Sequence, residues 1–202
     1  MHLPNAPHIA RRQVLVWGAA GCLAGRAGGA TAQGLPEAPP LSTPPAPGFV
    51  ASAIGSARLA GTSLFKYWGF EVYLASLWVT PAFKATTYWQ SPFALELNYL
   101  RTLEGRAIAQ RSLEEMQRAG NLAPELATAW LASMAQIFPN VNKGDTLTGL
   151  HLPERGARFL VNGQPLGEIT HADYSRRFFG IWLGASTSAP GLRAALLKGA
   201  PS

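Results

Sequence analysis

The sequence predicts an α+β domain in which a layer of helices covers a large, mostly antiparallel β-sheet. Three observations support this fold class. Runs of aromatic and β-branched residues come first, helical patterns follow, and the same order repeats towards the end of the chain. The dipeptide Asn162-Gly163 is typical of a two-residue hairpin turn, which joins antiparallel strands. The helical patterns have an apolar stripe, as expected for helices that pack on a sheet.

Three strands are predicted in the first half of the domain, over residues 51–60, 64–79 and 93–101. The second is longer than an ordinary strand, and Gly69 at its middle predicts a bend or a bulge. Because both of its faces are largely apolar, we expect this strand to be covered on both sides. The third strand aligns on one face Phe93, Leu95, Leu97, Tyr99 and Arg101.

Two helices are predicted next, over residues 105–119 and 123–137, with Gly120 and Pro139 placed to end them. The first helix brings into register Ile108, Ser112, Glu115 and Met116. The second presents a core-facing stripe of Leu126, Trp130, Met134 and Ile137.

The sheet resumes with a strand over residues 145–153 and a hairpin over residues 158–169, which turns at Asn162-Gly163. Asp145 could be an acid–base group, but at the start of a strand it more simply fixes a turn by bonding nearby backbone amides.

Two further helices complete the domain. Thr170 and Asp173 resemble a capping box that opens a helix over residues 171–183. Pro190 begins the last helix, and Gly199 ends it.

Residues 1–32 are typical of an export signal. The pair Arg11-Arg12 precedes a short apolar run, and Ala30-Thr31-Ala32 matches an A-x-A cleavage pattern. The paired arginines favour the twin-arginine route, and an ordinary secretion signal is the alternative. We therefore expect a periplasmic protein. In a second alternative, Cys22 is the lipidated residue of a lipoprotein.

A Pro-rich linker is predicted over residues 33–49, ahead of a folded domain over residues 50–202. The stretch 34–48 contains six prolines and no aromatic residue. Such a segment cannot bury enough apolar surface to offset its ordering entropy, so we expect an extended tether.

The composition excludes several classes of function. Without residues 1–32 the chain holds 14 Lys and Arg against 11 Asp and Glu, a net charge of +3, and no basic cluster with interleaved aromatic residues. We therefore expect no nucleic-acid partner. The apolar run near the N-terminus is shorter than the roughly 20 residues that span a bilayer, so no transmembrane segment is expected. The only histidines left, His151 and His171, lack a ligand spacing, so we expect no metal and no cofactor.

Arg101 lies at the end of the apolar face of the strand over residues 93–101. A guanidinium can hold a carboxylate bidentately while an apolar strip takes the tail out of water, which suits a fatty acid or a phenolic ligand. In the alternative, which the pattern alone favours, the strip is core and Arg101 reaches the rim. Glu71, among aromatic residues, is expected to face water or to pair with Lys66 or an arginine.

Five segments together resemble the chalcone-isomerase-like family, in its bacterial exported branch. They are GFEVYLASLWV (69–79), FALELNYLR (93–101), MAQIFPNVNKGD (134–145), RFLVNGQPLGEI (158–169) and FFGIWLGASTSAPGLRAALL (178–197). The resemblance implies an open-faced β-sandwich, with a large antiparallel sheet covered by a layer of helices and a ligand cleft between the two. It implies either an isomerase that closes a chalcone into a flavanone or a non-catalytic relative that binds fatty acids.

The resemblance also implies an arginine and a strand tyrosine in the cleft. Tyr73 matches the tyrosine through its Val-Tyr context. Counting back without a gap places Gly61 near the arginine position, and a short gap brings Arg58 there. Trp68 stands where true isomerases carry a threonine, and a bulky indole at that place is expected to reshape any flavonoid pocket.

We therefore expect a periplasmic, non-enzymatic protein that binds a small amphipathic ligand such as a fatty acid. No catalytic residue is assigned. Arg58 or Arg101 is the expected anion anchor, with Tyr73 and Tyr99 as hydroxyl partners. One alternative is an isomerase, an intramolecular lyase that acts on a chalcone-like phenolic substrate. The other is an interaction module whose cleft is packed shut.

Overall fold

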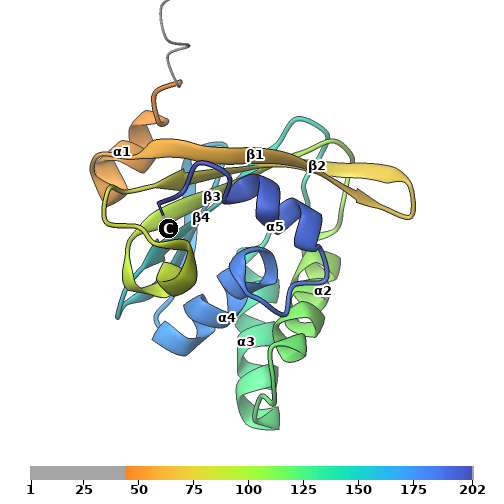
Figure 1. The fold of residues 1–202 in the computed structure, drawn as a ribbon. Helices are drawn as coiled ribbons and strands as arrows, with labels where there is room; N and C mark the ends of the chain where they lie inside the picture. The colour runs from red at the N-terminus through yellow and green to blue at the C-terminus, as the bar shows by residue number, and fades with distance from the viewer. Residues whose placement is uncertain (1–43, 202) are drawn as a thin grey trace, which may run out of the picture. The chain divides into compact units, whose positions relative to one another are not determined.

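The computed structural model describes residues 44–201. Six strands form one antiparallel sheet in which each strand pairs with the next along the chain (Figure 1). They are β1 (Arg58–Tyr67), β2 (Phe70–Val79), β3 (Phe93–Tyr99), β4 (Thr146–Leu152), β5 (Gly156–Val161) and β6 (Gln164–Ile169). The predicted signal peptide and the predicted linker up to residue 43 lie outside the described residues.

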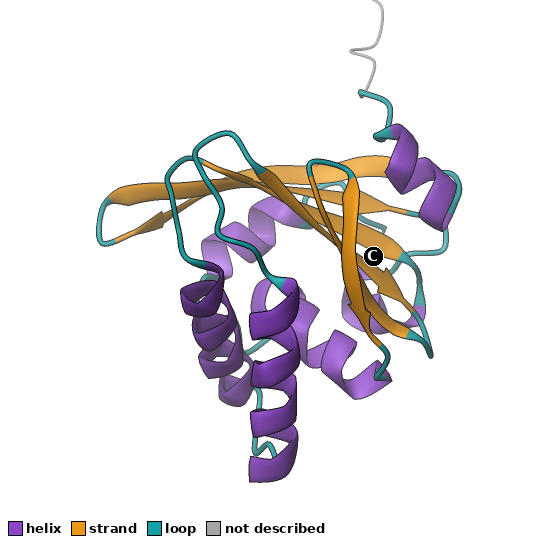
Figure 2. Cartoon of the chain, turned by 180° about the vertical axis from the view of Figure 1, so that it is seen from behind, coloured by secondary structure: helices purple, strands orange, loops and turns teal. Residues whose placement is uncertain are grey.

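Four helices lie on one side of this sheet (Figure 2). They are α2 (Gly105–Arg118), α3 (Pro124–Ile137), α4 (Ala172–Leu183) and α5 (Pro190–Leu196). The short α1 (Gly48–Ile54) lies on the other side, where Val50 packs with Trp78 and Leu150. A 3-10 segment, η1 (Ala85–Gln90), connects β2 with β3. The α+β class is confirmed, and no helix within residues 44–201 is long and apolar enough to cross a membrane.

The local signals predicted the second half of the fold well. Helices α2 and α3 end within one residue of the ends predicted for them. Asn162 and Gly163 form the turn between β5 and β6, with φ angles of 50° and 78°. Helix α4 covers the predicted range, but its N-cap is His171, whose side chain accepts a hydrogen bond from the Tyr174 backbone N–H. Thr170 was the wrong cap, because a histidine ring nitrogen supplies the acceptor instead.

The strand predicted over residues 64–79 is wrong, because this segment is a hairpin. Trp68 and Gly69 form a two-residue turn with φ angles of 50° and 82°, and Tyr67 pairs with Phe70 across it. Gly69 therefore reverses the chain rather than bending one strand. The expected cover on both sides is wrong as well, since the side chains around the turn are exposed.

The strand predicted over residues 51–60 is also wrong. Residues 48–54 form α1, and β1 begins only at Arg58. The apolar residues Val50 and Ile54 lie four apart, which is the spacing of one helix face as much as of a short strand run.

Helix α4 provides the centre of the core between the helices and the sheet. The Phe178 and Phe179 rings pack edge-on against Phe159 and Phe93, with centroids 5.2 Å and 4.9 Å apart. A Cβ atom at Gly149 on β4 would stand 3.0 Å from the Phe179 ring. The missing side chain at this position lets α4 approach the sheet closely.

Helix α5 is docked on β1 through the backbone at Gly61. A Cβ atom at this position would stand 2.1 Å from the carbonyl oxygen of Ala195. Just beyond the helix, the Gly199 N–H donates to the Ala60 carbonyl at 2.9 Å. Both contacts bring Leu192 of α5 over the inner face of the sheet.

The substitution Gly61→Ala should therefore lower the free energy of unfolding by about 1–3 kcal/mol, because the added methyl meets backbone atoms that cannot rotate away. Chemical denaturation measures this change. The matched control is Gly191→Ala within α5, where an added Cβ meets nothing within 4 Å. This control should be neutral or slightly stabilising through helix propensity. Equal losses from the two substitutions would contradict the docking of α5 on Gly61.

Candidate functional site

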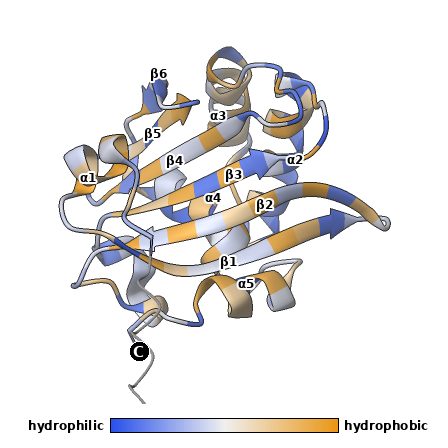
Figure 3. Cartoon of the chain, turned by 90° about the horizontal axis from the view of Figure 1, so that it is seen from above, coloured by the Kyte–Doolittle hydropathy of each residue, from blue (hydrophilic) through white to orange (hydrophobic). Residues whose placement is uncertain are grey.

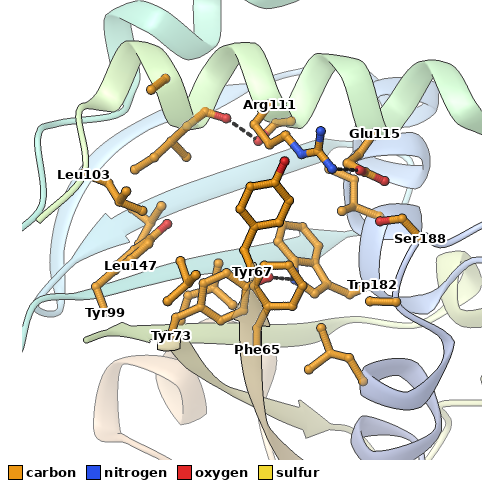
Figure 4. A pocket seen from close by; sticks show the side chains of 18 of the residues that line it. Phe65, Tyr67, Tyr73, Tyr99, Leu103, Arg111, Glu115, Leu147, Trp182 and Ser188 are labelled. Atoms are coloured by element: carbon orange, nitrogen blue, oxygen red, sulfur yellow. Dashed lines mark hydrogen bonds and ion pairs between the residues drawn. The ribbon is translucent and has the colours of Figure 1, made fainter. Parts of the chain in front are cut away.

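A cavity of about 410 Å³ lies between the sheet and the helices (Figure 4). Strands β1 to β4 line it from one side, and α2, α4 and α5 line it from the other. The volume falls within the roughly 300–1,000 Å³ that is typical of small-molecule sites. Its wall is mainly apolar and includes Val72, Leu97, Leu103, Ile108, Phe138, Leu147, Phe178 and Leu192.

Short side chains on helix α2 help to keep this space open. Ala107 and Ser112 line the cavity from α2. The Ser112 hydroxyl is turned back to donate to the Ile108 carbonyl of its own helix at 2.8 Å. Large apolar residues at these two positions would fill the space between α2 and the sheet.

Tyr73 and Tyr99 lie directly opposite each other on β2 and β3, and both line the cavity. The Trp182 Nε1–H donates to the Tyr73 hydroxyl oxygen at 3.0 Å, which ties α4 to the sheet. Because Tyr73 is the acceptor in this bond, its own hydroxyl proton stays available to a ligand. Burial raises the pKa of both phenols well above their ordinary value, so both remain neutral donors at neutral pH.

A charged pair from helix α2 also lines the cavity. Arg111 Nη2 donates to Glu115 Oε1 at 2.5 Å, and Arg111 Nη1 lies 3.3 Å from Glu114 Oε2. The Glu115 side chain is only 6% exposed, while that of Arg111 is 53% exposed. The guanidinium also lies over the Tyr67 ring, 5.6 Å from its centroid. Two carboxylates therefore already compensate the charge of Arg111.

Arg101 lines the cavity from the loop after β3 and is exposed. Its guanidinium lies over the Phe70 ring, 5.4 Å from the centroid. Within residues 44–201 no carboxylate forms an ion pair with it. Arg101 is thus an uncompensated cation at the cavity.

Of the four residues expected to bind a ligand, the structure brings together Tyr73, Tyr99 and Arg101. Arg58 is not among the residues that line the cavity. It begins β1 at the far end of the strand from the hairpin turn, where its Nη1 donates to the Gly199 carbonyl at 2.6 Å. The alignment with a short gap therefore selects Arg58, an arginine that contacts the C-terminal segment and does not line the cavity.

The cavity is also lined by three residues that were not among those expected to bind a ligand: Arg111, Glu115 and Trp182. A usable signal was present for the first two. Arg111 and Glu115 are four residues apart and lie on the same helix face as Ile108, so a charge pair interrupts an inward stripe. Trp182 lies within the helix predicted over residues 171–183, but only the structure shows that its indole N–H meets Tyr73.

The expected effect of Trp68 on the pocket is wrong. This residue does not line the cavity, and its side chain is 84% exposed at the hairpin turn. The Glu71 prediction is confirmed, since its carboxylate lies 3.2 Å from Lys66 Nζ. Asp145 fixes a turn as predicted, because its carboxylate accepts from the Asn142 N–H and from the Asn162 side chain.

The two histidines take structural positions. His151 is buried on β4 between the Ser175 hydroxyl at 2.7 Å and the Trp89 carbonyl at 2.9 Å. Burial lowers the pKa of its imidazole. Across residues 44–201, no three His, Cys, Asp or Glu side chains come together in a way that could hold a metal ion.

The groups that the cavity offers to a ligand are an apolar wall, two neutral phenol donors and one uncompensated guanidinium. These groups can hold an elongated apolar molecule with an anionic or hydrogen-bond-accepting head.

Comparison with known proteins places this geometry in context. A family model described as chalcone isomerase-like matches residues 55–198. Among solved structures, the fold is similar to that of a fatty-acid binding protein of Arabidopsis thaliana, with a TM-score of 0.55 and 13% sequence identity. This similarity covers 70% of the present chain and 87% of the Arabidopsis chain. No curated protein matched the sequence. At 13% identity, the structural similarity shows the fold alone.

The buried phenols predict that the stability of the fold decreases at alkaline pH. Burial raises the pKa of Tyr73, Tyr99 and Tyr174 well above its ordinary value and that of Tyr88 to about 12. The unfolded chain ionises its phenols near pH 10. The stabilising contribution of these protonated phenols is therefore complete below about pH 10 and falls as pH rises towards the folded-state values.

Ultraviolet titration of tyrosinate checks this prediction. At about pH 11 the folded protein should show much less tyrosinate absorbance than the same protein in denaturant. Equal absorbance in the two states, with the fold intact by circular dichroism, would show that the phenols are in contact with water.

Proposed function

We propose that this chain, which belongs to the chalcone isomerase-like family, is a non-enzymatic protein that binds a small amphipathic anion such as a fatty acid. One observation carries the proposal: an apolar cavity of about 410 Å³ has two neutral phenols and an unpaired guanidinium in its wall. The fold that this chain shares with a fatty-acid binding protein supports the same ligand class.

The apolar wall provides the driving force for binding the tail. Leu97 and Leu147 from the sheet face Phe178 and Leu192 from the helices across the cavity. An acyl chain placed between these layers is removed from water on both sides. This burial contributes a favourable free energy of roughly 25 cal/mol for each Å² of apolar surface buried.

The head group is held by the polar residues. Tyr73 donates its free hydroxyl proton, and Arg101 supplies the positive charge. Arg111 also lines the cavity, but its own carboxylate partners reduce its pull on a ligand. We therefore assign the role of anion anchor to Arg101 rather than to Arg58 or Arg111.

The cavity volume also bears on the two alternatives. An interaction module with a closed cleft would leave far less than about 300 Å³. An isomerase needs a guanidinium that is free to stabilise a substrate oxygen, and Arg101 meets that need as well as it meets the need of a carrier. The volume therefore favours a ligand-binding site over a closed module, and the chalcone assay below separates the carrier from the isomerase.

We also propose that the protein acts in the periplasm. The support is the sequence of residues 1–32, with its arginine pair, apolar run and A-x-A pattern. Fractionation of cells that express the full chain, with and without Arg11→Lys and Arg12→Lys together, tests both the compartment and the twin-arginine route. Periplasmic protein that is lost in the double variant supports the proposal, and cytoplasmic protein in both cases contradicts it.

Arg101→Gln should weaken the binding of a long-chain fatty acid about tenfold or more, because a hydrogen bond to a charged group is lost. Isothermal titration calorimetry measures the affinity. The matched control is Arg106→Gln, which removes an exposed arginine that neither lines the cavity nor forms an ion pair within residues 44–201. The control should bind as the parent does.

Native mass spectrometry of protein purified from its own compartment provides a second test. An acyl ligand should co-purify with the chain. If none co-purifies, and free fatty acids cause no thermal shift, the proposal fails.

The isomerase alternative has its own test, the loss of chalcone absorbance. The expected rate is that of buffer alone, in the parent and in Tyr73→Phe. A faster rate in the parent that Tyr73→Phe abolishes would establish an enzyme.

A further inference from the structure

The turn between β1 and β2 carries a cluster of exposed aromatic side chains. We name Tyr67, Trp68, Gly69 and Phe70 the hairpin tip. Its aromatic side chains are 49%, 84% and 64% exposed, in chain order. Leu64 and Leu74, which pair across the two strands further from the turn, are exposed as well. Figure 1 shows the tip extending past the helices that cover the rest of the sheet, and Figure 3 shows apolar residues along much of the two strands.

The backbone of this turn is unfavourable for a bulky residue such as Trp68. The chain contains a second two-residue turn of the same kind, Asn162-Gly163, at the same end of the sheet. Trp68 and Asn162 both have a φ of 50°, and the glycines that follow have φ angles of 82° and 78°. Asparagine tolerates this left-handed conformation, whereas a bulky residue adopts it rarely. An exposed tryptophan held in a strained position indicates a role outside the fold.

Beside the hairpin tip, Arg111 is paired with Glu114 and Glu115, and the cation left without a carboxylate partner within residues 44–201 is Arg101. Lys66 and Glu71, next to the turn, neutralise each other at 3.2 Å. Arg101 lies over the Phe70 ring and has no carboxylate partner within residues 44–201. The tip therefore combines a tryptophan, a tyrosine and a phenylalanine with one uncompensated guanidinium.

We propose that the hairpin tip docks on the interface of an anionic lipid bilayer. Tryptophan and tyrosine concentrate at the level of the lipid head groups, because their rings have an apolar body and a polar edge. A cation beside them is attracted by anionic head groups. The uncompensated charge of Arg101 complements such a surface.

The hairpin tip is continuous with the cavity. Tyr67 belongs to both, and Arg101, which also lines the cavity, lies over the Phe70 ring of the tip. Docking through the tip therefore places this side of the cavity at the head-group layer. Docking does not depend on the proposed function. The transfer of an amphipathic ligand between the bilayer and the cavity at this point does rest on it.

The experiment compares the full chain with Trp68→Asn in a vesicle-binding assay. Vesicles contain phosphatidylglycerol and phosphatidylcholine in equal parts, or phosphatidylcholine alone, and bound protein is measured by co-sedimentation. Both chains keep the same residues 1–43, so any binding by that segment is common to them. The matched control is Leu126→Asn, which removes an exposed apolar side chain from α3, away from the tip.

Trp68→Asn should weaken binding to the mixed vesicles about tenfold, the effect of removing one large side chain from an apolar environment. Leu126→Asn should bind as the parent does, and binding should drop when phosphatidylglycerol is omitted. The melting temperature of Trp68→Asn should equal or exceed that of the parent, because asparagine suits the turn. Phe70→Thr, which keeps a strand-compatible residue, should weaken vesicle binding in the same direction.

Three results would overturn the proposal. The first is vesicle binding that neither Trp68→Asn nor Phe70→Thr weakens. The second is equal weakening by Leu126→Asn. The third is concentration-dependent self-association of the parent, lost in Trp68→Asn and without vesicle binding, since it would show that a second copy covers the tip. Fatty-acid affinity in solution, measured on Trp68→Asn, separates this proposal from the carrier function: unchanged affinity with lost docking supports the separate role of the tip.

Discussion

The close contact between helix α4 and the middle of the sheet is the constraint on which the rest of the structure depends. The inner face of the sheet is apolar and must be covered, and Phe179 reaches it because Gly149 has no side chain in the way. Two turns of α4 therefore lie directly on the sheet. The same helix then places the Trp182 indole against the Tyr73 hydroxyl. On the other flank, short residues of α2 leave the space between helix and sheet unfilled, and the cavity is the result.

The cavity and the hairpin tip share one design. Where the helical layer ends, β1 and β2 continue beyond it and expose the aromatic residues that would otherwise complete the core. Arg101 and Arg111 lie over two of these rings, so charged and apolar groups are adjacent at this edge. The proposed binding of amphipathic anions would use such an edge, because an amphipathic ligand is exchanged with apolar surfaces and not only with water. The family fold supplies the layers, while these particular side chains define the chemistry.

Local patterns predicted the elements that depend on local chemistry. The two central helices follow from their apolar stripes, and the hairpin at residues 162–163 follows from Asn-Gly. The hairpin at residues 68–69 was missed because tryptophan is not a turn residue, although the backbone is the same. Among the site residues, Tyr99 and Arg101 were predicted from strand alternation and Tyr73 from the family resemblance. Arg111 could have been found from its helix face, whereas only the three-dimensional fold shows that Arg58 meets Gly199 and not the cavity.

The most direct test of the carrier function is a crystal structure of the protein with a long-chain fatty acid. The acyl tail should lie between Leu97 and Leu147 of the sheet and Phe178 of α4, with its carboxylate within hydrogen-bonding distance of the Tyr73 hydroxyl and on the side of Arg101. An empty or collapsed cavity in the presence of saturating ligand, or a carboxylate bound elsewhere on the surface, would contradict this account.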